Sequence, residues 1–277
     1  MIPTASQPVK VMGVINVTPD SFSDGGRFAA PEAALAQARR LISEGADMLD
    51  VGGESTRPGA EPVAEAAEIE RVVPLIRAIR AESAIPVSID TVKPAVARAA
   101  IEAGATMWND VTALRQSPDS LAVAAELGCD VVLMHMQGEP GTMQAEPHYD
   151  DVVEEVAAFL ARRAAEAMAA GVAQDRIWLD PGVGFGKHRI RHNLPLIAGL
   201  DRIVALGFPV LLGVSRKSFI GALDNDAAAD RRLGGSIAGA LAGAAAGVAA
   251  VRVHDVRETL QALRVWAAIA QAGTTSA

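Results

Sequence analysis

The segment Met48-Leu-Asp-Val-Gly-Gly-Glu-Ser-Thr-Arg57 joins a short apolar run to a cluster of polar residues, and this arrangement recurs along the chain. Eight strand-like runs begin near residues 10, 48, 86, 107, 130, 177, 209 and 249, and nearly every one ends on polar or charged side chains. In a (β/α)8 barrel the active site lies at the carboxyl ends of the strands. The pattern therefore predicts a (β/α)8 TIM barrel of the α/β class with one functional face.

Helical patterns alternate with the strand-like runs, which favours a parallel sheet with right-handed crossovers. Proline at the first turn of two of them, Pro31 and Pro94, is a start signal, and a glycine after several of them suits a left-handed end. A doubly wound sheet is the alternative, but it gathers its ligand contacts at one switch point. We predict a single domain over residues 1–277 with a core of about 10–271. The expected helices are Pro31–Glu44, Ala64–Glu82, Pro94–Ala103, Ser117–Leu127, Asp150–Ala170, His192–Ala205, Arg231–Gly247 and Val256–Ala270.

Composition narrows the class of protein. Half of the 277 residues are hydrophobic, and the net charge of −8 argues against a nucleic-acid surface, which would need a basic face. The single cysteine, Cys129, excludes an internal disulfide and is expected to be a buried thiol in a reducing compartment. The first ten residues carry no secretory signal pattern, and Ser236–Val251 is too short to span a bilayer. We therefore expect a cytoplasmic protein without membrane contacts.

The segment Asp180-Pro-Gly-Val-Gly-Phe-Gly-Lys187 resembles a phosphate loop but lacks the spacing of either common phosphate motif. It is better explained as a strand end that presents Asp180, followed by a glycine turn that lets a flat ligand approach the backbone. A tight turn in which Asp180 serves only as a cap is the alternative.

Two further strand ends carry cations. In Ser215-Arg-Lys-Ser218, Lys217 is expected to point into the barrel mouth, where it would form a Schiff base or hydrogen-bond an acceptor, while Arg216 points the other way. In Val251-Arg-Val-His-Asp255, Arg252 and His254 share one face of the strand. Two inward cations there suit an anion, because barrels often bind phosphate near strands 7 and 8. A solvated lysine and a purely structural pair are the alternatives.

Three short acceptor side chains, Asp90, Asn109 and Asp180, end three different strands. Together they would hydrogen-bond the N–H edge of a heterocycle, or, less simply, the two carboxylates would bind a divalent metal. Met134, Phe185 and Trp108 are expected to be core residues more often than a ligand platform. His148 and His192 are interpreted as surface residues.

Taken in order, these segments resemble the dihydropteroate synthase family of pterin-binding enzymes over almost the whole chain. The matching motifs are Met12-Gly-Val-Ile-Asn-Val-Thr-Pro-Asp-Ser-Phe-Ser-Asp-Gly-Gly26, Gly52-Gly-Glu-Ser-Thr-Arg-Pro-Gly59, Ser88-Ile-Asp-Thr-Val-Lys-Pro94, Trp108-Asn-Asp110, Leu133-Met-His-Met-Gln-Gly138, Asp180–Lys187, Gly213-Val-Ser-Arg-Lys-Ser218 and Arg252-Val-His-Asp255. Each motif alone is modestly specific, and their combination is highly so.

The resemblance implies a transferase of folate biosynthesis that condenses 6-hydroxymethyl-7,8-dihydropterin pyrophosphate with p-aminobenzoate, giving 7,8-dihydropteroate and pyrophosphate, with Mg²⁺ as cofactor. It assigns the pterin ring to Asp90, Asn109, Met134, Asp180, Phe185, Lys217 and Arg252. It assigns the pyrophosphate to Asn16, Thr56, Arg252 and His254, with Asn16 as the protein ligand of Mg²⁺. It assigns p-aminobenzoate, and the sulfonamide inhibitors that mimic it, to Phe22, Thr56, Arg57, Pro58, Gly184, Phe185, Lys217 and Ser218.

The catalytic residues implied by the resemblance are Asp20, Lys217, Arg252 and His254. The expected mechanism is dissociative: pyrophosphate leaves first, and Asp20 stabilises the cation left on the pterin methylene. The segments Thr18–Phe28 and Glu54–Pro62, rich in Gly, Ser and Pro, are expected to be mobile. A homodimer is expected from family habit and from the small residues of Ser236–Gly247.

Three other functions compete with this interpretation. A methyltetrahydrofolate methyltransferase barrel would share the pterin-holding acids but has no use for the anion site formed by Arg252 and His254. A non-catalytic pterin-binding paralogue is disfavoured by the presence of Asn16 together with that anion site. A Schiff-base aldolase acting through Lys217 would be detected by borohydride trapping.

Overall fold

The computed structural model describes residues 8–17, 26–55, 61–138 and 142–274. Eight parallel strands form one sheet in the order β6-β5-β4-β3-β2-β1-β8-β7. A bridge between Leu179 and Val210 joins the two outer strands, so the sheet closes into the predicted barrel. The strands are β1 Lys10–Asn16, β2 Met48–Gly52, β3 Val87–Asp90, β4 Met107–Asp110, β5 Asp130–Met134, β6 Ile177–Asp180, β7 Leu211–Leu212 and β8 Ala250–Val253.

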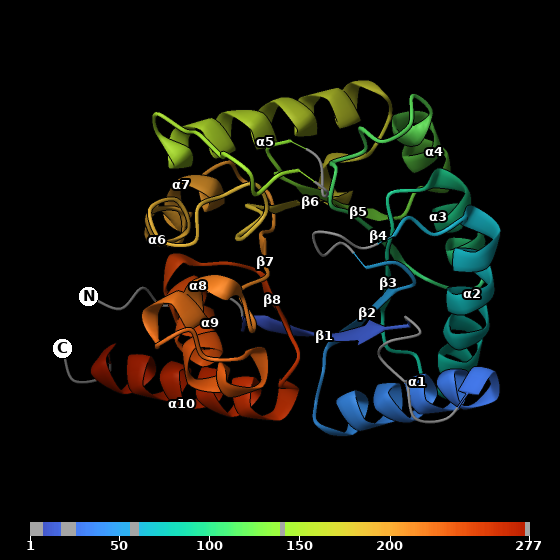
Figure 1. The fold of residues 1–277 in the computed structure, drawn as a ribbon, viewed down its shortest axis with the longest axis horizontal. Coiled ribbons are helices and arrows are strands. Elements are labelled where there is room, and N and C mark those ends of the chain that lie inside the picture. The colour runs from blue at the N-terminus through green and yellow to red at the C-terminus, as the bar shows by residue number, and fades with distance from the viewer. Residues whose placement is uncertain (1–7, 18–25, 56–60, 139–141, 275–277) are drawn as a thin grey trace.

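The helices form a ring around these strands, as Figure 1 shows. The helices cover the outward side chains of the sheet. The strands are therefore buried on both faces and appear in the sequence as apolar runs. The helices are α1 Gly26–Ser43, α2 Glu65–Glu82, α3 Pro94–Glu102, α4 Ser120–Leu127, α5 Val152–Ala169, α6 Asn193–Ala198, α7 Leu200–Val204, α8 Ser218–Leu223, α9 Leu233–Ala246 and α10 Val256–Thr274, with short 3-10 turns at Gln174–Arg176 and Ala229–Arg231.

The inside of the barrel is filled at one end by its own apolar cluster. Seven buried side chains from seven strands form it: Met12, Met48, Met107, Val132, Trp178, Leu211 and Ala250. Because side chains alternate across a strand, the residue two positions further along each strand also points inward. The strands thus rest on an apolar floor and present their next inward residues at the carboxyl ends.

Some expected elements differ in extent. Helix α1 begins at Gly26, so Pro31 lies inside it and does not start it, whereas Pro94 does open α3. The expected helix His192–Ala205 is divided at Gly199, which has a non-helical backbone and is packed against Val153. Helix α8 was not expected, because six residues are too few to show a helical period. The glycines expected at helix ends, Gly45, Gly104, Gly128, Gly171 and Gly207, all have positive φ.

Two further expectations concern burial. Cys129 is buried, and burial raises the pKa of its thiol to about 11, as expected for an inert structural cysteine. Within the described residues, no helix is both long enough and apolar enough to cross a membrane.

The small residues of α9 are accounted for by packing within the barrel. A Cβ on Gly239 would lie 3.0 Å from Val214, and a Cβ on Gly235 or Gly243 would overlap Ile220 or Leu212. These glycines let the helix approach β7, the segment after it and α8 closely, so they give no separate support to a dimer.

We expect Gly243→Ala to lower the free energy of unfolding by about 1–3 kcal/mol, because the added methyl meets the fully buried Leu212. Gly234→Ala in the same helix is the matched control, since nothing lies within 4 Å of its Cβ position. That control should be neutral or stabilising by up to about 1 kcal/mol. Urea denaturation measures the free energy of unfolding of both variants, and equal effects of the two substitutions would contradict the packing argument.

Candidate active site

The inner pocket at the carboxyl ends of the strands brings together residues that are far apart in sequence. All seven side chains that the resemblance assigns to the pterin ring line it, together with Val111, Gly182, Val183 and Gly213. Asp90 and Asp180 end β3 and β6, Asn109 is the penultimate residue of β4, and Arg252 extends inward from β8. The register pairs Asp90 with Asn109 and Met134 with Asp180, so neighbouring strands deliver these side chains at one level.

An ion cluster forms one wall of this pocket. The Arg252 guanidinium donates from Nε to Asp50 at 2.6 Å and from Nη2 to Asp90 at 2.8 Å. Burial disfavours the charge on Arg252, but the Asp50 and Asp90 carboxylates outweigh it and raise its pKa. Burial raises the pKa of Asp90, as do the charges of Asp50, Glu68 and Asp110, while Arg252 opposes the shift. The pocket therefore holds a carboxylate, Asp90, that readily accepts a proton or a hydrogen bond from an N–H donor.

Asp50 was missed in the sequence. It is fully buried inside β2, in the layer beneath the pocket, and also accepts a hydrogen bond from Asn109 Nδ2 at 3.3 Å. A charged residue within the otherwise apolar segment Met48-Leu-Asp-Val51 was the available signal.

Asp180 has both of the roles considered from the sequence, as a cap of the turn and as a carboxylate that faces the pocket. Its Oδ1 accepts a hydrogen bond from Gly182 N at 2.7 Å, which holds the glycine turn, and its side chain lines the pocket. Burial raises the pKa of Asp180, while the Gly182 N–H and Lys217 act in the opposite direction. The cap and the ligand-facing carboxylate are thus the same group.

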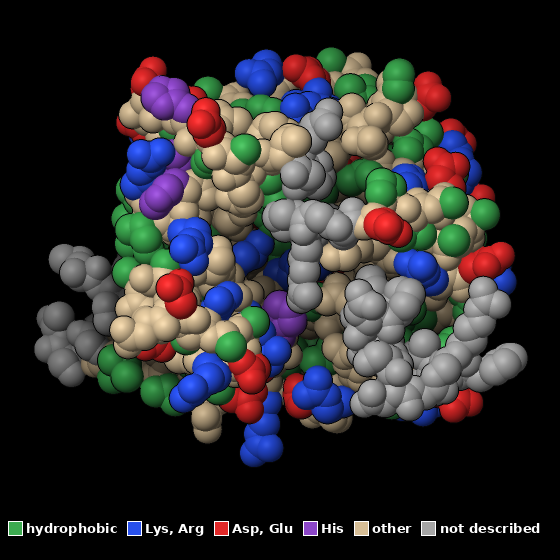
Figure 2. Space-filling model, viewed as in Figure 1, with side chains coloured by type: hydrophobic (Ala, Val, Ile, Leu, Met, Phe, Trp, Pro, Cys, Tyr) green, Lys and Arg blue, Asp and Glu red, His purple; other side chains and the backbone are tan. Residues whose placement is uncertain are grey.

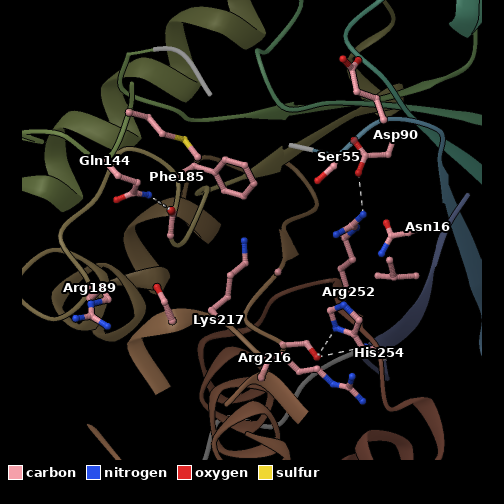
Figure 3. Close-up of a pocket in the computed structure, with 18 of the residues that line it drawn as sticks. Asn16, Ser55, Asp90, Gln144, Phe185, Arg189, Arg216, Lys217, Arg252 and His254 are labelled. Carbon is pink, nitrogen blue, oxygen red and sulfur yellow. Dashed lines mark hydrogen bonds and ion pairs between the residues drawn. The ribbon is translucent and has the colours of Figure 1, made fainter. Parts of the chain in front are cut away.

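Lys217 points into the pocket, as expected. Its Nζ lies 4.2 Å from the centroid of the Phe185 ring, and Figure 3 shows the two side chains directed toward one another. Burial lowers the pKa of Lys217 to about 8, against the opposing effect of Asp180. Arg216 instead pairs with Asp255, with Nη2 to Oδ1 at 2.6 Å, so it does point away from Lys217.

Phe185 is carried by a glycine loop that is built around the fully buried Lys187. Lys187 Nζ lies 3.0 Å from the carbonyl oxygens of Gly182 and Phe185, and 2.9 Å from His135 Nδ1. Gly182 and Gly186 have positive φ, and a Cβ on either would overlap the backbone after β5. The sequence showed Lys187 at the end of the motif, but gave no sign that it turns back under the loop.

A wider cavity opens above the inner pocket. Figure 2 shows Lys, Arg and His side chains around the hollow at the centre of this face. Its lining includes Asn16, His254, Gly184, Phe185, Lys217 and Ser218, and also Ser55, Arg189, Arg216 and Arg232. Asn16, Arg252 and His254, assigned to the pyrophosphate, therefore share one cavity, as do the described residues assigned to p-aminobenzoate.

The expectation of two inward cations on β8 is wrong for His254. Burial lowers the pKa of His254 to about 4, and Arg252 and Arg216 lower it further, so the imidazole is neutral at pH 7. Its Nδ1 lies 3.0 Å from Ser215 Oγ. In the absence of an anion, the strand therefore presents one cation, Arg252, beside a neutral imidazole.

Several predicted site residues lie outside the described residues: Asp20, Phe22, Thr56, Arg57 and Pro58. The same holds for most of the two segments expected to be mobile, Thr18–Phe28 and Glu54–Pro62. Of the remaining expectations, Trp108 is a core residue whose Nε1 donates to Thr91 O at 2.7 Å, and His148 is exposed. His192 is not a surface residue: it is buried, with its ring 4.9 Å from that of Tyr149.

Residues 8–17, 26–55, 61–138 and 142–274 contain no group of three or more His, Cys, Asp or Glu side chains that could hold a metal ion. Asn16 ends β1 with its carboxamide in the outer cavity, near Arg252 and His254 in Figure 3. A single amide oxygen suits an ion that takes its other ligands from water and phosphate, which is the habit of Mg²⁺.

Comparisons with known proteins agree with this arrangement. The sequence profile described as "Pterin binding enzyme" matches residues 12–254. A dihydropteroate synthase from Haemophilus influenzae is 45% identical over 263 residues, which cover 95% of this chain and 94% of that protein. The chain belongs to the dihydropteroate synthase family.

Solved structures of this family share the fold. A Xanthomonas albilineans dihydropteroate synthase with 4-aminobenzoic acid superposes with a TM-score of 0.89 at 51% identity, covering 95% of this chain and 93% of that one. A structure of the Xanthomonas albilineans enzyme with 7,8-dihydropteroate superposes with a TM-score of 0.86 at 48% identity, covering 96% of this chain and 95% of that one. The residues 12–254 that match the "Pterin binding enzyme" profile include every described residue assigned to the two cavities.

Lys187→Met should lower the free energy of unfolding by about 1–3 kcal/mol at pH 7, because the Gly182 and Phe185 carbonyls lose a buried donor. Arg189→Met is the control in the same loop. Its exposed pair with Asp226 contributes no more than about 1 kcal/mol. Equal stabilities of the two variants would contradict the role given to Lys187.

The pH dependence of the stability provides a second test of the role of Lys187. Burial lowers the pKa of Lys187 to about 7, whereas an unfolded lysine keeps its proton up to about pH 10.4. Between these values the unfolded chain binds more protons, so the Lys187 contribution to stability rises with pH. Denaturation curves from pH 7 to pH 10 should show this rise in the wild type and lose it in Lys187→Met.

Proposed function

We propose that this protein is a dihydropteroate synthase, which condenses 6-hydroxymethyl-7,8-dihydropterin pyrophosphate with p-aminobenzoate to give 7,8-dihydropteroate and pyrophosphate. One observation carries the proposal: Asp90, Asn109, Asp180, Lys217 and Arg252 converge, from five strand ends, on one buried pocket. A flat heterocycle with several N–H donors and ring acceptors matches that set. The family and the barrel fold support the same reaction.

The pterin ring is held edge-on by groups of opposite character. Asp90 and Asp180 accept from its N–H donors, Asn109 both accepts and donates, and Lys217 donates to a ring acceptor. Met134 lies on the apolar side of the pocket with Val111 and Phe185. Because the pocket is desolvated, each unmatched donor costs more than it would in water.

The pyrophosphate lies above the ring, against Arg252, His254, Asn16 and Thr56. Arg252 keeps its charge at all accessible pH values, and an arriving anion would raise the pKa of His254 from its low resting value. Asn16 would hold Mg²⁺ through its amide oxygen. When bound, Mg²⁺ supplies charge neutralisation at the departing pyrophosphate. The Asn16 carboxamide lines the outer cavity, which places it on the side where the pyrophosphate would lie.

The p-aminobenzoate lies at the rim, beside Gly184, Phe185, Lys217 and Ser218. Phe22, Thr56, Arg57 and Pro58 complete its pocket from the two segments outside the described residues. Phe185 and Lys217 border both substrates, since they line the inner pocket and the outer cavity. Sulfonamides would occupy the p-aminobenzoate position.

Bond cleavage precedes bond formation in the proposed mechanism. The C–O bond to pyrophosphate breaks, the pyrophosphate leaves with the electron pair, and the electron-rich pterin stabilises the methylene cation. Arg252 and His254 neutralise the leaving charge through preorganised contacts, and Asp20 stabilises the cation. The neutral aryl amine then forms the C–N bond and loses its proton, and Lys217 keeps the ring oriented throughout.

The whole chain, 1–277, is proposed to act as one pterin-binding domain, cytoplasmic and homodimeric. The dimer is supported by exposed apolar side chains one turn apart on α10, Val265 and Ile269, rather than by the small residues of α9. Light scattering at micromolar concentration tests it, and a monomer would contradict it.

The activity is tested by pyrophosphate release. We expect release that requires p-aminobenzoate, Mg²⁺ and the pterin pyrophosphate together, and that a sulfonamide inhibits by competing with p-aminobenzoate but not with the pterin. Pterin binding without turnover would instead indicate a non-catalytic paralogue. Methyl transfer from methyltetrahydrofolate would indicate the methyltransferase alternative.

Substitutions at Asp180 separate its two contacts. Asp180→Asn keeps an Oδ1 acceptor for Gly182 N but removes the charge, so pterin affinity should fall by about 1.5–3 kcal/mol while the melting temperature stays close to that of the wild type. Asp180→Ala should lose affinity and lower the melting temperature as well. Calorimetry and thermal unfolding check both, and unchanged affinity in Asp180→Asn would make this residue a turn cap only.

A further inference from the structure

Asp50 occupies a position that the proposed reaction does not use directly. Its side chain is fully buried and lines neither the inner pocket nor the outer cavity. Its Oδ2 nevertheless accepts from Arg252 Nε at 2.6 Å and from Asn109 Nδ2 at 3.3 Å. One carboxylate thus contacts, from below, two residues that form the wall of the pocket.

The Arg252 guanidinium pairs with two carboxylates, and only one of them is accessible to a ligand. Its Nη2 donates to Asp90, which lines the pocket, and its Nε donates to Asp50, which does not. A ligand that engages Asp90 Oδ2 competes with Arg252 for that oxygen atom. Asp50 cannot be reached by the ligand, so its hold on the guanidinium persists when Asp90 is occupied.

The neighbouring position in the sheet shows that this layer does not require a charge for packing. Ser88 of β3 is the register partner of Asp50, and its hydroxyl is buried without a hydrogen-bond partner in the described structure. A buried carboxylate costs several kcal/mol unless it is well paired. Asp50 is therefore explained by the pairs it makes, because the adjacent site tolerates a small polar side chain with none.

We propose that Asp50 is a positioning residue: it fixes Arg252 and Asn109 in place and leaves Asp90 free to bind the pterin. This inference rests on the proposed function. Asp50 touches no substrate and acts only through these two neighbours. It also adds negative charge next to Asp90, which strengthens the tendency of Asp90 to accept a donor.

The charges that act on Asp90 determine how pterin binding should depend on pH. The charged side chains that act on it are Arg252, Asp50, Glu68, Asp110 and Lys217. Burial and the negative neighbours raise the pKa of Asp90, and Arg252 lowers it. Removing the charge of Asp50 takes away one repulsion and strengthens the pairing of Arg252 with Asp90. Both effects lower the pKa of Asp90, so its carboxylate persists to lower pH.

The experiment measures binding of 6-hydroxymethylpterin and turnover between pH 5.5 and pH 9 in the wild type, Asp50→Asn and Ser88→Ala. In Asp50→Asn we expect the pH midpoint of pterin binding to move down by about one unit. We also expect kcat to fall about tenfold or more as Arg252 loses its orientation, with KM for p-aminobenzoate unchanged. Ser88→Ala, at the adjacent position, should match the wild type in all three.

A purely structural role for Asp50 would weaken binding at every pH without moving the midpoint, and that result overturns the proposal. A crystal structure of the wild-type protein with 6-hydroxymethylpterin keeps the proposal testable where Asp50→Asn does not fold. There Arg252 Nε should remain within hydrogen-bond distance of Asp50, and its departure overturns the proposal. Failure of the wild type to bind the pterin is a different result, which counts against the proposed function itself.

Discussion

Closure of the sheet constrains everything else in this molecule. Once β6 and β7 are joined through Leu179 and Val210, every second side chain of each strand must fit inside the barrel. The lower inward layer is apolar, with Met12, Met48 and Met107 among its members. The layer above cannot be apolar and still recognise a polar ligand, so it holds acids, an amide and an arginine that satisfy one another. The polar layer is stable because the apolar floor beneath it excludes water.

Charge balance within the polar layer follows from that burial. A lone carboxylate there would be protonated, and a lone guanidinium would be strongly disfavoured. The pairs of Arg252 with Asp50 and Asp90 avoid both outcomes, and the opposite charges of Lys217 and Asp180 also favour one another within the pocket. The resulting pocket is pre-organised but not saturated. Asp90 and Asp180 keep acceptor capacity, Lys217 keeps its donors, and the imidazole of His254 is ready to gain a proton from the effect of an anion.

The glycine loop after β6 shows how backbone geometry serves the same pocket. Its positive φ angles let it lie directly against the segment after β5, and Lys187 fills the space that the glycines leave under it. The carbonyl groups of this tight turn would otherwise be buried without donors. The loop is therefore fixed from the inside, and its outer side presents Phe185 to Lys217 and to the cavity.

The sequence alone determined the barrel, the order of its elements and the strand ends that carry the pocket, because strand periodicity and the placement of polar residues are local properties. Asp90, Asn109, Asp180, Lys217 and Arg252 could be found in this way, and the family motifs assigned them to a pterin. Only the tertiary structure revealed that Asp50 pairs with Arg252 across 202 positions, that Lys187 turns under its own loop, and that His254 is neutral. These features depend on which charges share a desolvated volume, and distance along the chain carries no information about that.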